Sequence, residues 1–204
     1  WADSVAAAQR LWVLALLRDD EGLAQGRAFS VVSPAVTSHS LGGLPIGSNT
    51  GRMFLAQPFW VRWRAPVPYP VYCIDDPEVR TYVLLRLTLQ QPIRSWTTAN
   101  PSTILLYLRK LQHHWEDLRA DCAEGTLIRG PAARLSPQLR RSLRLQRGVL
   151  PEEPVITKIW SLRRINCWTG GAAGFFLDRL PTALGAPVDR KSTRLNSSHL
   201  VISY

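Results

Sequence analysis

One segment, residues 165–180, constrains the fold of this chain more than any other. It reads as a short buried strand (165–168), a turn that holds Thr169, Gly170 and Gly171, and a helix (172–180). Glycine has no Cβ, so a flat ligand can lie directly on such a turn, and ligands of open α/β sheets bind at the carboxyl ends of strands. The segment predicts an α/β fold with a ligand site at this turn. The alternative is that the two glycines are present only because the turn has no room for side chains.

Helical and extended segments alternate along the rest of the chain. Expected helices cover 6–23, 77–87, 101–124, 136–147 and 172–180, and expected strands cover 27–33, 59–63, 93–98 and 165–168. Residues 34–51 are rich in glycine, serine and proline and are expected to form a long loop. Such alternation is typical of a mostly parallel sheet with helices on both faces.

Two of the expected helices carry clear start signals. Asp76 precedes Pro77, and Asn100 precedes Pro101, so each pair fits an N-cap followed by proline in the first turn. This interpretation makes Asp76 a capping residue rather than a catalytic carboxylate. Gly125 is expected to end the helical region that begins at Pro101.

Composition excludes several classes of protein. The hydrophobic share of 46% is that of a globular chain, and no run of about 18 apolar residues indicates a membrane span. We therefore expect no membrane partner. Cys73, Cys122 and Cys167 are an odd set without close spacing, which argues against a zinc site or a disulfide framework. A reducing, cytoplasmic location is expected, and no metal ligands are assigned.

The charge is strongly basic, with a formal net charge of +10. Arg140, Arg141, Arg144 and Arg147 cluster on one expected helix. Such a cluster either binds nucleic acid or forms a solvated helix face. We favour the solvated face, and expect no nucleic-acid partner, because no aromatic residues are interleaved with these arginines.

The two ends of the chain are expected to be unnatural. The chain starts at Trp1 within an expected helix, and residues 189–204 resemble a translated sequencing adapter, whose common codons give 189–199 and whose index and continuation fit 200–204. We interpret 189–204 as a non-native tail and leave it out of fold reasoning. Residues 1–188 are then a fragment, truncated on both sides.

Several segments match the pattern of one enzyme family. They are 33–35, 42–48, 100–106, 116–118, 124–127, 160, 165, 167–171 and 180–181. Asn-Pro-Ser-Thr at 100–103 together with Cys-Trp-Thr-Gly-Gly at 167–171 is specific as a pair. The chain resembles the auxin-responsive promoter (Gretchen Hagen) family of acyl acid–amido synthetases, especially its bacterial members. The resemblance covers nearly all of residues 1–188.

The resemblance implies a fold, a reaction and site residues. It implies an internal part of the large N-terminal adenylating domain of an adenylate-forming ligase. Such a ligase uses ATP and Mg²⁺ to adenylate a small carboxylic acid, and an amino acid then displaces AMP to form an amide. The nucleotide is expected at Thr169, Gly170, Gly171 and Ala172. Arg10 is the expected acyl-acid-binding residue, with Arg18 as a competing candidate.

Parts of the family pattern are missing from this chain. The phosphate loop of the family would precede Trp1, and its metal-binding glutamate and C-terminal lid would follow Val188. The glycines of 42–51 are no substitute, because no Gly-Lys-Ser/Thr follows them. We therefore expect the full-length parent to be an enzyme and this chain alone to be inactive. A non-catalytic paralogue and a basic nucleic-acid-binding module are the alternatives. The acyl substrate, the amine and the oligomeric state are not readable from the sequence.

Overall fold

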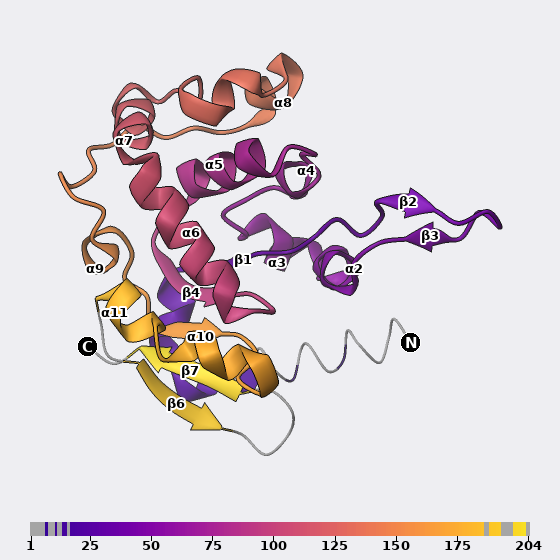
Figure 1. The fold of residues 1–204 in the computed structure, drawn as a ribbon, viewed down its shortest axis with the longest axis vertical. Helices are drawn as coiled ribbons and strands as arrows, with labels where there is room; N and C mark the ends of the chain where they lie inside the picture. Colours follow the sequence, from indigo (N-terminus) through magenta and orange to yellow (C-terminus); the bar gives the residue numbers. More distant parts are fainter. Residues whose placement is uncertain are drawn as a thin grey trace.

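The computed structural model describes residues 7, 11, 14–15, 17–185, 188–192 and 198–202. A five-stranded sheet in the order β1-β4-β5-β7-β6 organises the chain (Figure 1). β1 (Arg27–Ser30), β4 (Ile93–Thr97) and β5 (Arg164–Asn166) run parallel. β6 (Val188–Ser192) and β7 (Ser198–Ile202) form an antiparallel hairpin that pairs with β5 through β7. The predicted α/β class with a parallel sheet is confirmed.

Helices fill most of the chain between the strands. They are η1 (Glu21–Gln25), α2 (Asn49–Ala56), α3 (Phe59–Trp63), α4 (Tyr69–Tyr72), α5 (Pro77–Thr88), α6 (Pro101–His113), α7 (Trp115–Glu124), η2 (Gly130–Arg134), α8 (Pro137–Ser142), α9 (Ile156–Ile159), η3 (Gly171–Ala173), α10 (Gly174–Leu177) and α11 (Leu180–Leu184). None of the helices in the described part of the chain is long and apolar enough to cross a bilayer.

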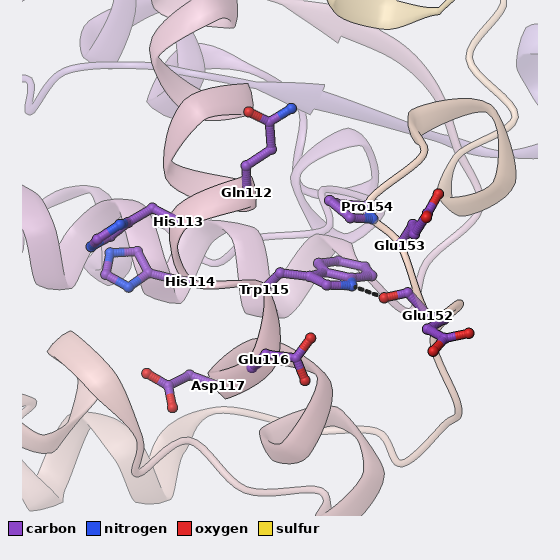
Figure 2. Close-up of a pocket in the computed structure, with 9 residues that line it drawn as sticks. All are labelled: Gln112, His113, His114, Trp115, Glu116, Asp117, Glu152, Glu153 and Pro154. Atoms are coloured by element: carbon purple, nitrogen blue, oxygen red, sulfur yellow. Dashed lines mark hydrogen bonds between the residues drawn. The ribbon is translucent and has the colours of Figure 1, made fainter.

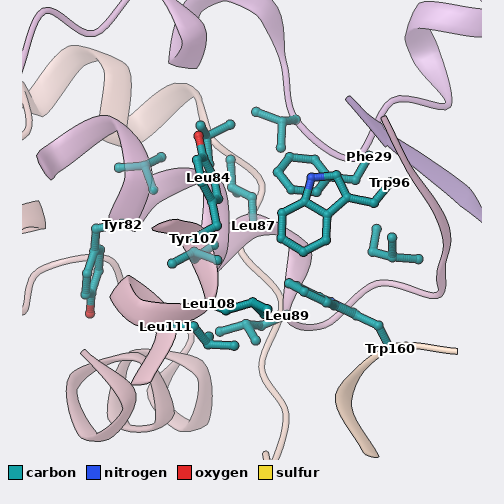
Figure 3. Close-up of a cluster of buried hydrophobic side chains, with 14 of the residues drawn as sticks. Phe29, Tyr82, Leu84, Leu87, Leu89, Trp96, Tyr107, Leu108, Leu111 and Trp160 are labelled. Atoms are coloured by element: carbon teal, nitrogen blue, oxygen red, sulfur yellow. The ribbon is translucent and has the colours of Figure 1, made fainter. Parts of the chain in front are cut away.

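The core lies on one face of the parallel strands. Phe29, Trp96 and Ile165 are in register across β1, β4 and β5, and all three are fully buried. Tyr107 of α6 contacts the rings of Phe29 and Trp96, and Trp160 meets Trp96 edge-on at 5.5 Å between centroids (Figure 3). Because side chains alternate along a strand, the neighbouring row of residues belongs to the opposite face of the sheet.

The predicted helix signals are confirmed by hydrogen bonds. The Asp76 carboxylate accepts from the Glu78 amide at 2.9 Å and the Val79 amide at 3.3 Å. The Asn100 side chain accepts from the Ser102 amide at 3.1 Å. Gly125 ends α7 with a left-handed φ of 71°, a conformation that glycine adopts at low cost. The predicted helix over 101–124 divides at His114 into α6 and α7.

The predicted strand over 59–63 is wrong, because this segment forms α3. The aromatic and branched residues favoured a strand, but a strand needs a neighbour to satisfy its backbone groups. The helix satisfies them locally instead, with the Val61 and Arg62 amides donating to Pro58 O at 3.0 and 3.1 Å. The local hydrogen bonds of the helix outweighed the β propensity of these residues.

Other boundaries also differ from the sequence predictions. The expected loop over 34–51 contains the hairpin of β2 (Ser38–His39) and β3 (Pro45–Ile46), which projects from the body, and the start of α2 (Figure 1). The expected helix over 136–147 ends at Ser142. The expected helix over 172–180 is divided among η3, α10 and α11. These errors lie where short elements replace one long element.

Candidate functional site

The carboxyl ends of β1, β4 and β5 form one edge, and hydrogen bonds extend beyond the strands along it. The Val31 amide donates to Thr97 O at 2.8 Å, and the Thr98 amide donates to Asn166 O at 2.9 Å. The Trp168 amide then donates to Ala99 O at 3.2 Å. The root of the turn after β5 is therefore fixed to the segment after β4.

The turn itself presents bare backbone. Thr169 is half-buried, and Gly170 and Gly171 are exposed. Among the described residues, a Cβ built on either glycine would meet no atom within 4 Å. Gly171 has a φ of 60°, which accounts for glycine at that position. Gly170 has φ −88° and ψ 162°, which any residue can adopt. Neither its conformation nor a close neighbour in the described chain requires glycine at position 170.

Two other glycines show what a purely steric requirement looks like. A Cβ on Gly47 would lie 2.1 Å from Ala35 O, and one on Gly51 would lie 2.3 Å from Ser33 O. Both glycines are needed so that backbone segments can approach each other. The glycines at 47 and 51 are therefore packing residues at the base of the β2–β3 hairpin.

Aromatic side chains flank the turn on both sides in the sequence. Trp168 is 69% exposed and Phe175 of α10 is 64% exposed. The Arg179 guanidinium lies 4.6 Å from the centre of the Phe175 ring. Exposed aromatic rings close to the turn in the sequence are of the kind that contacts a flat apolar ligand.

Sequence reasoning missed one polar contact at this edge. The Asn166 amide nitrogen, at the end of β5, donates to Thr97 Oγ1 of β4 at 3.1 Å. The signal was a polar residue inside an otherwise apolar strand, at 165–168. This contact ties the last residues of two strands together directly beneath the turn.

The remaining predicted site residues are only partly described. Ala172 lies in η3 directly after the glycines, and only its backbone is described. Arg10 lies outside the described residues. Arg18, its competitor, is exposed at the end of a helical segment. The structure therefore brings Thr169, Gly170, Gly171 and the backbone of Ala172 together and leaves the acyl-acid residue a prediction.

Two surface hollows in the described part of the chain are lined by residues outside the turn. One, of about 400 Å³, lies between the α6–α7 junction and residues 152–154. There the Trp115 indole donates to Glu152 O at 2.8 Å (Figure 2). Burial, aided by neighbouring His113, lowers the pKa of His114. The second, of about 360 Å³, lies between α4 and α8 and includes Cys73. Among the described residues, no group of His, Cys, Asp and Glu is placed to hold a metal ion.

The basic cluster near α8 takes part in packing. Arg140 donates to Ala132 O at 2.8 Å and to Leu135 O at 3.2 Å. The Arg147 side chain lies against the backbone of Gly125, where a Cβ would meet it at 2.6 Å. Two of the four clustered arginines thus support neighbouring backbone, and the absence of a nucleic-acid partner stays a prediction.

Comparisons with known proteins identify the fold and the family. The model of the GH3 family N-terminal domain matches residues 2–187. A similarity search among curated protein sequences found no match. Among solved structures, the chain resembles GH3.15 acyl acid amido synthetase, with a TM-score of 0.68 and 16% identity over 90% of this chain and 34% of that one.

A second solved structure gives the same result. It is AtGH3.15 acyl acid amido synthetase in complex with 2,4-DB, with a TM-score of 0.67 and 15% identity over 90% of this chain and 35% of that one. The chain thus spans about a third of the length of these structures. At this identity the likeness shows the fold, whereas the family model matches most of the sequence. The chain belongs to the GH3 family and carries residues of its N-terminal domain.

Proposed function

We propose that this chain is part of the adenylating domain of an ATP-dependent acyl acid–amido synthetase. A small carboxylic acid would be activated as its acyl-adenylate, and an amino acid would then displace AMP to form an amide. The observation that carries the proposal is the open backbone of Gly170, where neither the backbone conformation nor a neighbour among the described residues requires glycine. Family membership supplies the class of reaction.

The turn fits the adenine part of a nucleotide. Exposed backbone at Gly170 and Gly171 lets a flat ring approach to van der Waals distance, which a side chain at position 170 would prevent. Thr169 adds a hydroxyl at the same edge. When bound, ATP supplies the adenylyl group that makes the carboxylate electrophilic. This chain's residues would bind and orient the adenylate, an entropic contribution to catalysis.

The fit to Mg²⁺ is different. Among the described residues, no cluster of carboxylates or imidazoles is placed to bind a metal. No described residue of this chain is assigned to Mg²⁺. In the full-length parent, Mg²⁺ would bind together with the phosphates of ATP. The proposed location of that parent is the cytoplasm.

An AMP-binding measurement tests the proposal. AMP is titrated into the purified chain, its Gly170→Val variant and a Gly42→Val control, followed by calorimetry. Gly42 lies in the exposed hairpin loop, away from the sheet edge. We expect AMP binding that Gly170→Val weakens about tenfold or more and that Gly42→Val leaves unchanged. Equal affinity for all three proteins, or no binding by any, would overturn the assignment of the turn.

A pyrophosphate-exchange assay tests the activity of the chain alone. We expect no exchange with ATP and a panel of carboxylic acids, because this chain spans about a third of the length of the solved GH3.15 structures and no group placed to hold a metal ion lies among its described residues. Exchange above the background of the Gly170→Val variant would contradict that expectation. In that case this chain would hold a complete adenylation site.

A further inference from the structure

Residues 22–74 form a stretch without any acidic residue, which we call the acid-free segment. It contains the β2–β3 hairpin, α2 and α3. Its charged residues are four arginines, Arg27, Arg52, Arg62 and Arg64. Half of the large hydrophobic residues that are exposed in the described part of the chain also belong to it, namely Val36, Leu41, Leu44, Ile46, Leu55, Phe59 and Trp63. Positive charge and exposed apolar side chains thus occur together in one segment.

The β2–β3 hairpin carries aliphatic side chains at its tip. Leu41 is fully exposed and Leu44 is 71% exposed, and they lie on either side of Gly42 and Gly43. The hairpin extends from the body beside α2 (Figure 1). The Ser40 amide donates to Leu44 O at 2.9 Å, which closes the loop. An apolar tip that is held out in water is typical of an interaction site.

The helix α3 adds two exposed aromatic rings and an exposed arginine. Phe59 and Trp63 are four residues apart, so they lie on the same face of the helix, and they are 77% and 79% exposed. Arg62, between them in the sequence, is exposed as well. Tryptophan and arginine combine an apolar body with a polar end, which suits the boundary between an apolar phase and water.

The arginines of the acid-free segment donate hydrogen bonds to neutral groups. Arg27 donates to Arg64 O at 2.9 Å, and Arg64 donates to Ala24 O at 3.0 Å. Arg52 donates to Pro45 O at 3.2 Å, which places its guanidinium beside β3 of the hairpin. Within the described part of the chain, no carboxylate forms an ion pair with these three arginines. Their positive charge therefore complements an anionic partner.

We propose that the acid-free segment is a peripheral binding surface for a membrane that contains anionic lipids. The tip of the hairpin enters the boundary between headgroups and acyl chains, and Arg52 and Arg62 contact the anionic headgroups. Buried apolar area and attraction to anionic lipid together set the strength of such binding. The expectation of no membrane partner rests on the lack of a spanning segment, which does not bear on contact at the surface. The proposal stands apart from the proposed activity.

The aliphatic side chains favour a membrane over a nucleic acid as the partner. Arginines interleaved with aromatic residues, as in 59–64, also suit a single-stranded nucleic acid, whose bases stack on the rings. Leu41, Leu44 and Ile46 offer no ring on which a base could stack, whereas acyl chains bury such side chains favourably. A membrane thus accounts for both the arginines and the hairpin tip, and a nucleic acid accounts only for α3.

Co-sedimentation of the full chain with vesicles tests the surface. Vesicles of phosphatidylcholine and phosphatidylserine, at a ratio of about three to one, are compared with vesicles of phosphatidylcholine alone. We expect binding to the mixed vesicles only, and we expect Leu41→Ser combined with Leu44→Ser to weaken it about tenfold or more. The control combines Leu106→Ser with Ile128→Ser, at positions 49% and 48% exposed outside the segment, and should leave binding unchanged. No binding to mixed vesicles, or equal weakening in both double variants, would overturn the proposal.

A second pair of variants tests the charge. Arg52→Gln combined with Arg62→Gln should weaken binding to the mixed vesicles about tenfold or more. Arg141→Gln combined with Arg144→Gln makes the same change in net charge at exposed positions near α8 and should change binding by less than about threefold. Equal weakening would mean that net charge alone attracts the chain, and the proposed surface would be wrong. Binding of a single-stranded oligonucleotide without any binding of vesicles would also overturn it.

Thermal denaturation of each variant accompanies the binding measurements. The substituted side chains are exposed, so Tm should stay within a few degrees of the wild-type value. The hairpin variant and the arginine variant lie in different elements, so the loss of one fold leaves the other variant as a test. Unchanged vesicle binding in either folded variant would contradict the proposed surface.

Discussion

The Tyr82 hydroxyl donates a 2.9 Å hydrogen bond to the buried carboxylate of Asp121, across 39 residues of sequence. This bond joins α5 to α7. Thr126 Oγ1 and Arg129 Nη1 donate to the same carboxylate at 2.7 and 3.0 Å. Arg86, also buried, donates to the backbone oxygens of Asp121 and Thr126. The end of α7 is thus held by polar bonds inside the fold.

Removing the carboxylate should cost more than removing the phenol hydroxyl. We expect Asp121→Asn to lower the free energy of unfolding by about 2–3 kcal/mol, because an amide NH2 in place of one carboxylate oxygen cannot accept the hydrogen bonds from Tyr82 and the Arg129 amide. Tyr82→Phe should cost about 1–2 kcal/mol, because only one hydrogen bond to the carboxylate is lost. Urea denaturation measures both. Equal losses in the two variants would show that the Tyr82 hydrogen bond accounts for the whole contribution of the carboxylate.

The same carboxylate should make stability depend on pH. Burial raises the pKa of Asp121, but hydrogen bonds from Thr126, Tyr82 and the Arg129 and Ile128 amides more than offset it, so the folded pKa lies below its usual value. Its stabilising contribution is therefore present above the unfolded pKa and is lost as pH falls through the folded pKa. We expect the difference in stability between the wild type and Asp121→Asn to shrink from pH 6 towards pH 2, measured by urea denaturation. A constant difference would contradict this.

Substitution by valine should have different effects on stability at Gly170, which has open space, and at Gly47, which packs against backbone. Gly170→Val should change the free energy of unfolding by less than about 0.5 kcal/mol, since the backbone is extended and the space is open. Gly47→Val should destabilise by about 1–3 kcal/mol, because its Cβ would collide with Ala35 O. Thermal denaturation of the two variants compares them. A large loss at position 170 would show a structural need for glycine there.

The cap of α5 offers a matched pair of substitutions. Asp76→Ala should lower the free energy of unfolding by about 1 kcal/mol, because the Glu78 and Val79 amides lose their acceptor. Asp76→Asn keeps the acceptor and loses only the exposed 3.1 Å ion pair with Arg134, so it should be nearly neutral. Guanidinium denaturation of both variants distinguishes cap from ion pair. A loss in Asp76→Asn as large as in Asp76→Ala would favour the ion pair.

Helix caps and turns, which depend on residues close in the sequence, could be predicted from the sequence. Contacts between residues that are distant in the sequence could not. Asp76 and Asn100 were assigned as caps because each cap bonds to amides two or three residues away. The segment 59–63 was misassigned because its state depends on whether a neighbouring strand exists. At the candidate site, turn chemistry indicates Thr169, Gly170 and Gly171 as a ligand turn, and their role in nucleotide binding stays a prediction. The Asn166–Thr97 contact joins residues 69 apart in sequence, and no spacing rule indicates it.

The hydrogen bonds that continue past β4 and β5 have a consequence for recognition. The Thr98 and Trp168 amides donate hydrogen bonds between the ends of β4 and β5. The sheet therefore holds the base of the glycine turn in place in the absence of a ligand. A ligand that binds this turn then loses less affinity to the ordering of the loop than it would if the loop were not held by the sheet. Conversely, altering the backbone near Ala99, far away in sequence, should disturb the turn as much as altering the turn itself.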